Sequence, residues 1–133
     1  MILGLGTDLC AIERIGRAIE KRHFMERVYT PAELARLDAA TDLRRPEIAA
    51  GLFAAKEAVA KALGTGFSGF FTSDIEIMPD AAGHPVCALL NGAKARAEAL
   101  AGGESYAMWV SITHESGMAA ATAILEKREA RDE

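Results

Sequence analysis

A long helix predicted over 46–64 constrains the fold of this chain more than any other feature of the sequence. Alanine, the residue with the least entropy to lose in a helix, fills most of its interior. Pro46 suits a first helical turn, and Gly64 suits the left-handed turn that ends a helix. At about 100° per residue, one stripe of this helix is apolar and is expected to face a core. The stripe consists of Leu52, Ala55, Val59, Ala62 and Leu63.

Glu57 and Lys61 lie one turn apart on the other side of the same helix. An exposed Glu–Lys pair at this spacing stabilises a helix by about 0.3–0.5 kcal/mol and needs no further role. Spacing alone favours that interpretation. Two other residues weaken it, because Asp8 and His114 each stand at the end of a predicted strand.

Composition restricts the class of protein. The chain has 133 residues, half of them hydrophobic, which is enough for one domain with a substantial core. Its formal net charge of −4 argues against nucleic acid or an anionic membrane as a default partner. We expect no signal peptide and no membrane span. Cys10 and Cys87 have no metal-site spacing and are expected to be free thiols. The sequence therefore predicts a cytoplasmic protein with a single domain over 1–133.

A strand is predicted over 1–9, with Gly4, Gly6 and Asp8 on one face. Glycines weaken a strand, so this pair indicates that something passes close over that face. Asp8 is expected at the end of the strand, on a face left uncovered. Two interpretations of Asp8 are equally open, a functional carboxylate and an N-terminal cap for the following helix.

The next helix is predicted over 11–24, with Arg14, Arg17 and Lys21 aligned opposite its isoleucines. Such a basic stripe is usually a solvated face. On a chain of negative net charge it is also weak evidence for an acidic macromolecular partner. A capping box from Thr30 to Glu33 predicts a further helix to about Ala40.

Strands are predicted over 74–78, 86–90, 106–113 and 118–125, with a helix over 91–100 and a frayed tail over 126–133. This order predicts an α+β fold in which helices pack on one face of a mostly antiparallel sheet. The sheet is expected to leave apolar surface for a subunit partner.

Asp8, Glu57, Lys61 and His114 are the residues that could perform chemistry. Two carboxylates suit Mg²⁺, which completes its shell with water and substrate phosphates, and they do not suit zinc. Lys61 could neutralise a leaving phosphate, and His114 could bind an anionic group. A glycosidase and a catalytic triad are both less consistent with these residues. Taken alone, His114 is more simply an isolated turn histidine.

Three groups of residues together resemble the holo-[acyl-carrier-protein] synthases, the small trimeric group of the 4′-phosphopantetheinyl transferase superfamily. The resemblance covers essentially the whole chain, in order. It is carried by Gly6-Thr7-Asp8 with Ile12 and Arg14, by Phe53-Ala54-Ala55-Lys56-Glu57-Ala58 with Lys61 and Gly64-Thr65-Gly66, and by Val110-Ser111-Ile112-Thr113-His114-Glu115.

This resemblance implies a homotrimer with active sites at the subunit interfaces, coenzyme A as donor, Mg²⁺ as cofactor and apo-acyl carrier protein as acceptor. It implies that Asp8 and Glu57 bind the metal and, with Lys61 near the pyrophosphate, are catalytic. His114 would reach coenzyme A from the neighbouring subunit. The loop residues Gly64, Thr65 and Gly66 are further candidates to contact coenzyme A. Arg14, with Arg17 and Lys21, would meet the acidic carrier protein.

Two positions depart from the family pattern, because Leu52 and His84 stand where basic residues are common. If such cations hold a coenzyme A phosphate, two alternatives are open here: a weaker affinity for coenzyme A, or an affinity that rests on other residues such as Lys56. The implied reaction is attack by a carrier-protein serine on the pantetheine-side phosphorus of coenzyme A, releasing adenosine 3′,5′-bisphosphate. Glu57 and a metal-bound water both remain open as the proton acceptor. The rival hypotheses are a non-catalytic trimeric scaffold and another Mg²⁺-dependent phosphoryl or nucleotidyl transferase.

Overall fold

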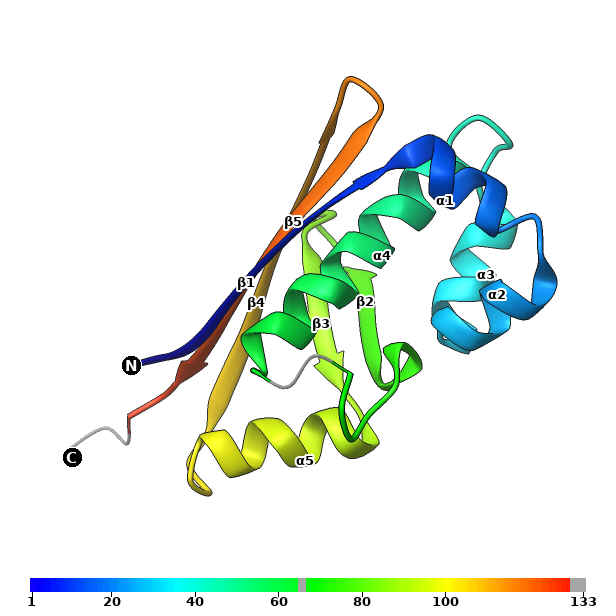
Figure 1. The fold of residues 1–133 in the computed structure, drawn as a ribbon. Helices are drawn as coiled ribbons and strands as arrows, with labels where there is room; N and C mark the ends of the chain where they lie inside the picture. Colours follow the sequence, from blue (N-terminus) through cyan, green and yellow to red (C-terminus); the bar gives the residue numbers. More distant parts are fainter. Residues whose placement is uncertain (65–66, 130–133) are drawn as a thin grey trace.

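The computed structural model describes residues 1–64 and 67–129. These residues form helices, strands and a short 3₁₀ helix, η1. Figure 1 shows how the helices and strands are arranged. The elements are β1 (Ile2–Ala11), α1 (Ile12–Ala18), α2 (Arg22–Val28), α3 (Pro31–Ala39), α4 (Arg45–Ala62), η1 (Thr72–Asp74), β2 (Ile75–Pro79), β3 (Pro85–Leu89), α5 (Asn91–Leu100), β4 (Tyr106–Glu115) and β5 (Met118–Lys127).

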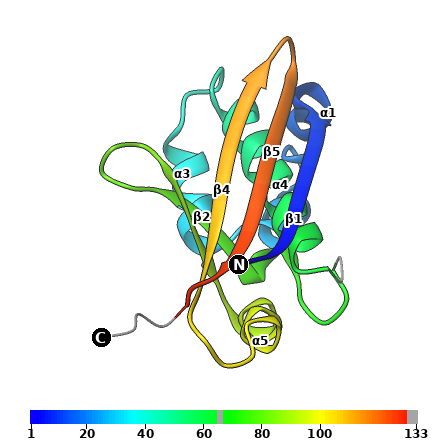
Figure 2. The same ribbon diagram turned by 90° about the vertical axis from the view of Figure 1, so that its left-hand side faces the viewer.

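Two antiparallel sheets organise the fold. The larger has strand order β1-β5-β4, and β2 and β3 form a separate hairpin. Helix α4 lies along one face of the three-stranded sheet (Figure 1). Figure 2 shows the opposite face, on which no element of the described chain packs. The predicted α+β class, with helices on one face of an antiparallel sheet, is confirmed.

The long helix forms as its sequence predicts. Helix α4 has a proline in its first turn, and Gly64 follows it with a φ of +81°. Its apolar stripe is buried, and much of the rest of its surface is buried as well. Small side chains on α4 allow this close packing, so the helix forms the centre of the core.

The two glycines of β1 let α4 approach the strand closely. A Cβ atom on Gly4 would lie 1.8 Å from the carbonyl oxygen of Ala62, and one on Gly6 would lie 1.9 Å from that of Ala58. The expectation that something passes close over this face is confirmed. The same face carries Asp8, so the prediction that Asp8 lies on an uncovered face is wrong.

The helix predicted over 11–24 is two short helices. β1 continues to Ala11, α1 ends at Ala18, and Lys21 precedes α2 in an extended conformation. The predicted stripe of Arg14, Arg17 and Lys21 therefore does not lie on one helix. Arg17 pairs with Glu13, their atoms Nη1 and Oε1 being 3.2 Å apart. Asp8 does not cap α1, since the N-cap position is Ala11 and has no side-chain hydrogen bond.

Two further expectations concern the ends of elements. The capping box is present at α3, where Thr30 and Glu33 exchange side-chain-to-backbone hydrogen bonds. Strand β5 runs to Lys127, which pairs with Tyr106, so the first two residues of the predicted frayed tail are part of the sheet.

Both cysteines are free thiols, as the sequence predicts. None of the described helices is long and apolar enough to span a bilayer.

Candidate active site

Asp8 on β1 and Lys61 on α4 form an ion pair, although 53 residues separate them in sequence. Lys61 Nζ lies 3.4 Å from Asp8 Oδ1, and it also donates a hydrogen bond of 2.9 Å to the carbonyl oxygen of Thr7. In the described part of the chain, the carboxylate that lies within 4 Å of Lys61 Nζ is that of Asp8 and not that of Glu57. The simple interpretation of Glu57 and Lys61 as an i,i+4 pair is therefore wrong.

Glu57 shares this environment. Burial raises the pKa of the Glu57 carboxyl, and the negative charge of Asp8 raises it further. The positive charges of Lys61 and Arg14 act in the opposite direction. The two carboxylates thus lie close enough to repel each other, which is the arrangement that a bound cation would relieve.

The close packing of α4 on β1 explains this grouping. Ala58 and Ala62 meet Gly6 and Gly4 through their backbone oxygens, and Glu57 and Lys61 immediately precede them in the helix. The contacts that hold the helix to the strand thereby fix both side chains relative to β1.

The carboxylates fit a magnesium ion. Asp8 and Glu57 supply hard oxygen ligands, and Mg²⁺ is usually held by one or two carboxylates with water and substrate oxygens. Among the residues that the structure describes, no group of three or more His, Cys, Asp and Glu side chains is placed to hold a metal. Asp8 and Glu57 therefore suit an ion that takes few ligands from the protein.

His114 is not brought to this cluster within one chain. It lies on β4 opposite Ala119 of β5, and Ala119 in turn lies opposite Cys10 of β1. His114 is therefore two strand spacings, about 10 Å, from β1. Gly51 of α4 passes over this same face, where its Cβ would lie 3.0 Å from Ile112 Cγ2.

A pocket of about 260 Å³ lies on the His114 side of α4. Arg36 of α3, Leu52 of α4, Ile77 of β2 and His114 of β4 each contribute to its walls. Arg44, at the start of α4, also lines it. Sequence reasoning missed Arg36 and Arg44, because only the packing of the β2–β3 hairpin against α4 reveals the pocket. Glu47 lines it too, with its Oε2 3.3 Å from Arg44 Nε. With two arginines and one glutamate the pocket keeps a net positive charge, which suits an anionic ligand.

Lys56 is not available to bind a coenzyme, so that prediction is wrong. Its side chain is completely buried, and its ammonium group is taken up by Glu33 and by the carbonyl oxygens of Thr72 and Ile75. Of the predicted loop residues, Gly64 is described and has the expected left-handed backbone. Thr65 and Gly66 lie outside the described residues.

The two departures from the family pattern have different surroundings. Leu52 is buried and forms part of the pocket wall. His84 is exposed beside the hairpin turn, with its Nδ1 3.8 Å from Asp80 Oδ2. Arg14 lies with its guanidinium carbon 5.8 Å from the centre of the Phe53 ring on α4, which places it beside the Asp8–Glu57–Lys61 cluster.

Comparison with known proteins identifies the family. The family model of the 4′-phosphopantetheinyl transferase superfamily matches residues 4–113. A holo-[acyl-carrier-protein] synthase of Clostridium acetobutylicum is 42% identical over 127 residues, covering 95% of this chain and 98% of that protein. One of Solidesulfovibrio magneticus is 48% identical over 129 residues, covering 95% and 99%.

Solved structures of the same group of enzymes have a similar fold. The crystal structure of a holo-(acyl-carrier-protein) synthase from Bacillus anthracis in complex with CoA (3′,5′-ADP) has a TM-score of 0.80 at 32% identity, covering 96% of this chain and 99% of that one. The enzyme from Neisseria meningitidis has a TM-score of 0.82 at 33% identity, covering 96% and 100%. The chain therefore belongs to the 4′-phosphopantetheinyl transferase superfamily and is a transferase of its holo-[acyl-carrier-protein] synthase group.

Proposed function

We propose that this protein transfers the 4′-phosphopantetheine arm of coenzyme A to a serine of apo-acyl carrier protein in a Mg²⁺-dependent reaction. The observation that carries the proposal is the convergence of Asp8, Glu57 and Lys61 from a strand and a helix that are distant in sequence. The names of the relatives point to the same activity. A cytoplasmic location stays a prediction from the sequence.

The reaction exchanges one phosphorus–oxygen bond for another. The serine oxygen of the carrier protein forms a bond to the pantetheine-side phosphorus, the phosphoanhydride bond breaks, and adenosine 3′,5′-bisphosphate leaves. The serine proton passes to a base at the site. Lys61 would offset the charge that grows on the leaving diphosphate oxygen, because its ammonium group is held in position by Asp8 and by the carbonyl oxygen of Thr7.

Asp8 and Glu57 are the residues that would hold Mg²⁺. When bound, the ion supplies positive charge to the diphosphate oxygens. Repulsion between the two carboxylates supports this assignment, because burial raises the pKa of Glu57 and the negative charge of Asp8 raises it further. Lys61 remains paired with Asp8, so it orients that carboxylate as well as facing the substrate.

We propose further that the protein is a homotrimer whose active sites lie between subunits. His114 and the pocket that it lines are on one side of α4, whereas Asp8 and Lys61 are on the other. A second copy can therefore supply the His114 side of each site. The basic pocket would take the phosphorylated nucleotide of coenzyme A.

The uncovered face of the sheet supports this assembly. Leu5, Ile124 and Trp109 lie in one row across its three strands, on the side away from α4. Leu5 is 63% exposed and Trp109 53% exposed. An apolar row of this kind is the surface that a subunit partner covers.

The carrier protein would approach α1. Arg14 stands beside the cluster, and its charge, with those of Arg17 and Lys21, would attract an acidic protein. Electrostatic attraction of this kind chiefly raises the rate of association.

Intact-mass measurement tests the activity. The protein is incubated with coenzyme A, Mg²⁺ and an apo-acyl carrier protein. A mass gain of one phosphopantetheine on the carrier is the expected result. An unchanged carrier mass across fatty-acid, polyketide and peptide carriers would favour a scaffold, and a different adduct would favour another phosphoryl or nucleotidyl transferase.

A further inference from the structure

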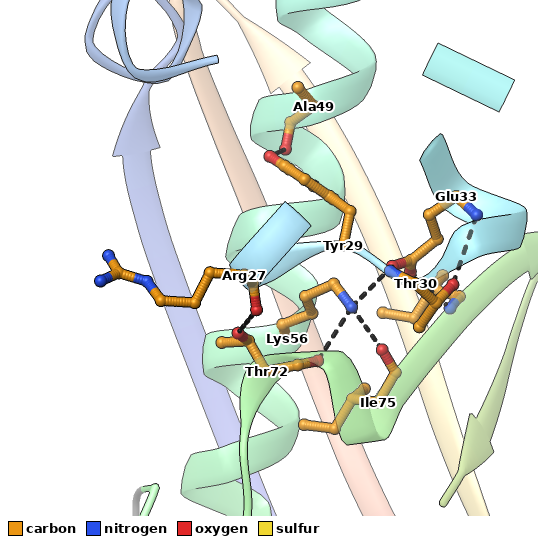
Figure 3. Close-up of polar contacts among 9 residues, drawn as sticks. Arg27, Tyr29, Thr30, Glu33, Ala49, Lys56, Thr72 and Ile75 are labelled. Carbon is orange, nitrogen blue, oxygen red and sulfur yellow. Dashed lines mark hydrogen bonds and ion pairs between the residues drawn. The ribbon is translucent and has the colours of Figure 1, made fainter. Parts of the chain in front are cut away.

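A buried ion pair that the proposed chemistry does not use lies behind the active-site helix. Lys56 of α4 and Glu33 of α3 are both 0% exposed, and Lys56 Nζ lies 2.7 Å from Glu33 Oε1. Figure 3 shows the two side chains meeting between α3, α4 and the segment that leads into β2.

Every hydrogen-bonding group of the pair has a partner. The Lys56 ammonium donates to the carbonyl oxygens of Thr72, at 3.0 Å, and Ile75 as well as to Glu33. Glu33 Oε1 accepts from the backbone N–H of Thr30 and Oε2 from that of Ile77, each at 2.9 Å. The three N–H groups of an ammonium are thus all used.

Stability alone does not account for such a pair. Burying two charges costs so much solvation that well-packed apolar side chains of similar size often serve equally well. Unlike apolar side chains, the pair makes directional hydrogen bonds to particular backbone groups. It fixes the β2 backbone at two points, Ile75 and Ile77, relative to two helices.

The elements that the pair joins are the ones that form the basic pocket. Arg36 lies three residues after Glu33 on α3, and Leu52 lies four residues before Lys56 on α4. Ile77, whose N–H binds Glu33, itself lines the pocket. Three of its walls are therefore held together by two side chains.

The same turn of α4 faces the proposed metal site. Lys56 and Glu57 are adjacent, so their side chains leave the helix about 100° apart. One points to Glu33 and the β2 backbone, and the other is near Asp8. A shift of this turn would alter both sites.

We propose that the Glu33–Lys56 pair is a positioning element that holds the β2–β3 hairpin and α3 against α4, so that the pocket keeps the shape that binds the nucleotide of coenzyme A. This inference rests on the proposed function, because it takes coenzyme A as the ligand of the pocket. Neither residue contacts the substrate, and both act through the residues that line the pocket.

The test uses the double variant Glu33→Gln/Lys56→Met, which removes both charges and leaves no unpaired buried ion. Val59→Ala is the matched control, because Val59 is equally buried on α4 but does not line the pocket. Both are compared with the parent protein for thermal midpoint, for kcat and KM with coenzyme A, and for direct binding of adenosine 3′,5′-bisphosphate by calorimetry.

We expect the double variant to fold, to raise KM for coenzyme A by about tenfold and to weaken bisphosphate binding by a similar factor, with kcat changed by less than about threefold. Hydrogen exchange at the Ile77 amide should be faster. Val59→Ala should lower the thermal midpoint and leave KM and bisphosphate affinity unchanged.

A folded double variant with the parent's KM and bisphosphate affinity would overturn the proposal. So would an equal rise in KM for Val59→Ala, because lost stability would then be sufficient. If the double variant does not fold, the same measurements on Glu33→Met/Lys56→Met, which places apolar side chains at both positions and likewise leaves no unpaired buried ion, decide the question. A parent protein that neither binds the bisphosphate nor modifies a carrier would contradict the proposed function instead.

Discussion

Lys61 Nζ on the long helix lies 3.4 Å from Asp8 Oδ1 on the first strand, and this contact brings a cation and a carboxylate to the place where Glu57 is also found. The glycines beneath the helix make the contact possible, because they let the backbone of α4 lie directly on β1. The candidate active site is thus a consequence of close backbone packing.

Substitution of either carboxylate should abolish transfer without unfolding the protein. Asp8→Asn and Glu57→Gln keep side-chain size but remove a ligand for Mg²⁺, so kcat/KM should fall on the order of 100-fold or more. Burial raises the pKa of Glu57 and the charge of Asp8 raises it further, so the folded protein carries this charge at a cost that Glu57→Gln removes. Without metal, Glu57→Gln should therefore melt no lower than the parent. Full activity in either variant would remove the metal assignment.

Gly6→Ala should destabilise the fold strongly. A Cβ at this position would lie 1.9 Å from the Ala58 carbonyl oxygen, so β1 and α4 must separate. We expect a loss of about 2–4 kcal/mol in the free energy of unfolding, measured by urea denaturation. Thr7→Ala, on the exposed side of the same strand, is the control and should cost less than about 1 kcal/mol. Equal losses would show that close packing at Gly6 is unimportant.

Arg14→Ala should slow modification of the carrier protein. Removing its charge weakens attraction to an acidic partner, so kcat/KM for the carrier should fall about tenfold at low salt and less at high salt. Binding of coenzyme A by calorimetry should stay nearly unchanged. Lys94→Ala, an exposed change on α5, is the charge-matched control and should have little effect. A collapse of coenzyme A binding in Arg14→Ala would contradict its role as a partner contact.

Active sites shared between subunits predict complementation. Asp8→Ala and His114→Ala trimers should each be impaired, since each lacks one side of every site. When the two are refolded together in equal amounts, about a quarter of the sites receive Asp8 from one chain and His114 from its neighbour. Activity in the mixture should rise above that of either variant alone. Mixtures no more active than their components would contradict a shared site.

Local signals in the sequence were sufficient to predict the ends of several helices and one close backbone contact. Pro46 and Gly64 bound α4 closely, and the Thr30–Glu33 capping box gave the start of α3. Gly4 and Gly6 indicated a close approach. Each of these features rests on backbone chemistry within a few residues, which a sequence states directly.

Features that depend on tertiary packing could not be predicted in the same way. Lys56 has the polarity of a surface residue, and only the arrival of Glu33 and the β2 backbone explains its burial. The break between α1 and α2 has neither glycine nor proline at Ile19–Lys21 to mark it. The basic pocket likewise required the β2–β3 hairpin to be placed against α4.

A metal ion held by both carboxylates is tested most directly by an anomalous difference map from crystals grown with coenzyme A and Mn²⁺, which substitutes for Mg²⁺ and scatters anomalously. We predict a peak within coordination distance of the Asp8 and Glu57 carboxylates and of the coenzyme A diphosphate, with His114 reaching the nucleotide from the neighbouring subunit. A diphosphate bound away from both carboxylates, with no peak between them, would contradict it.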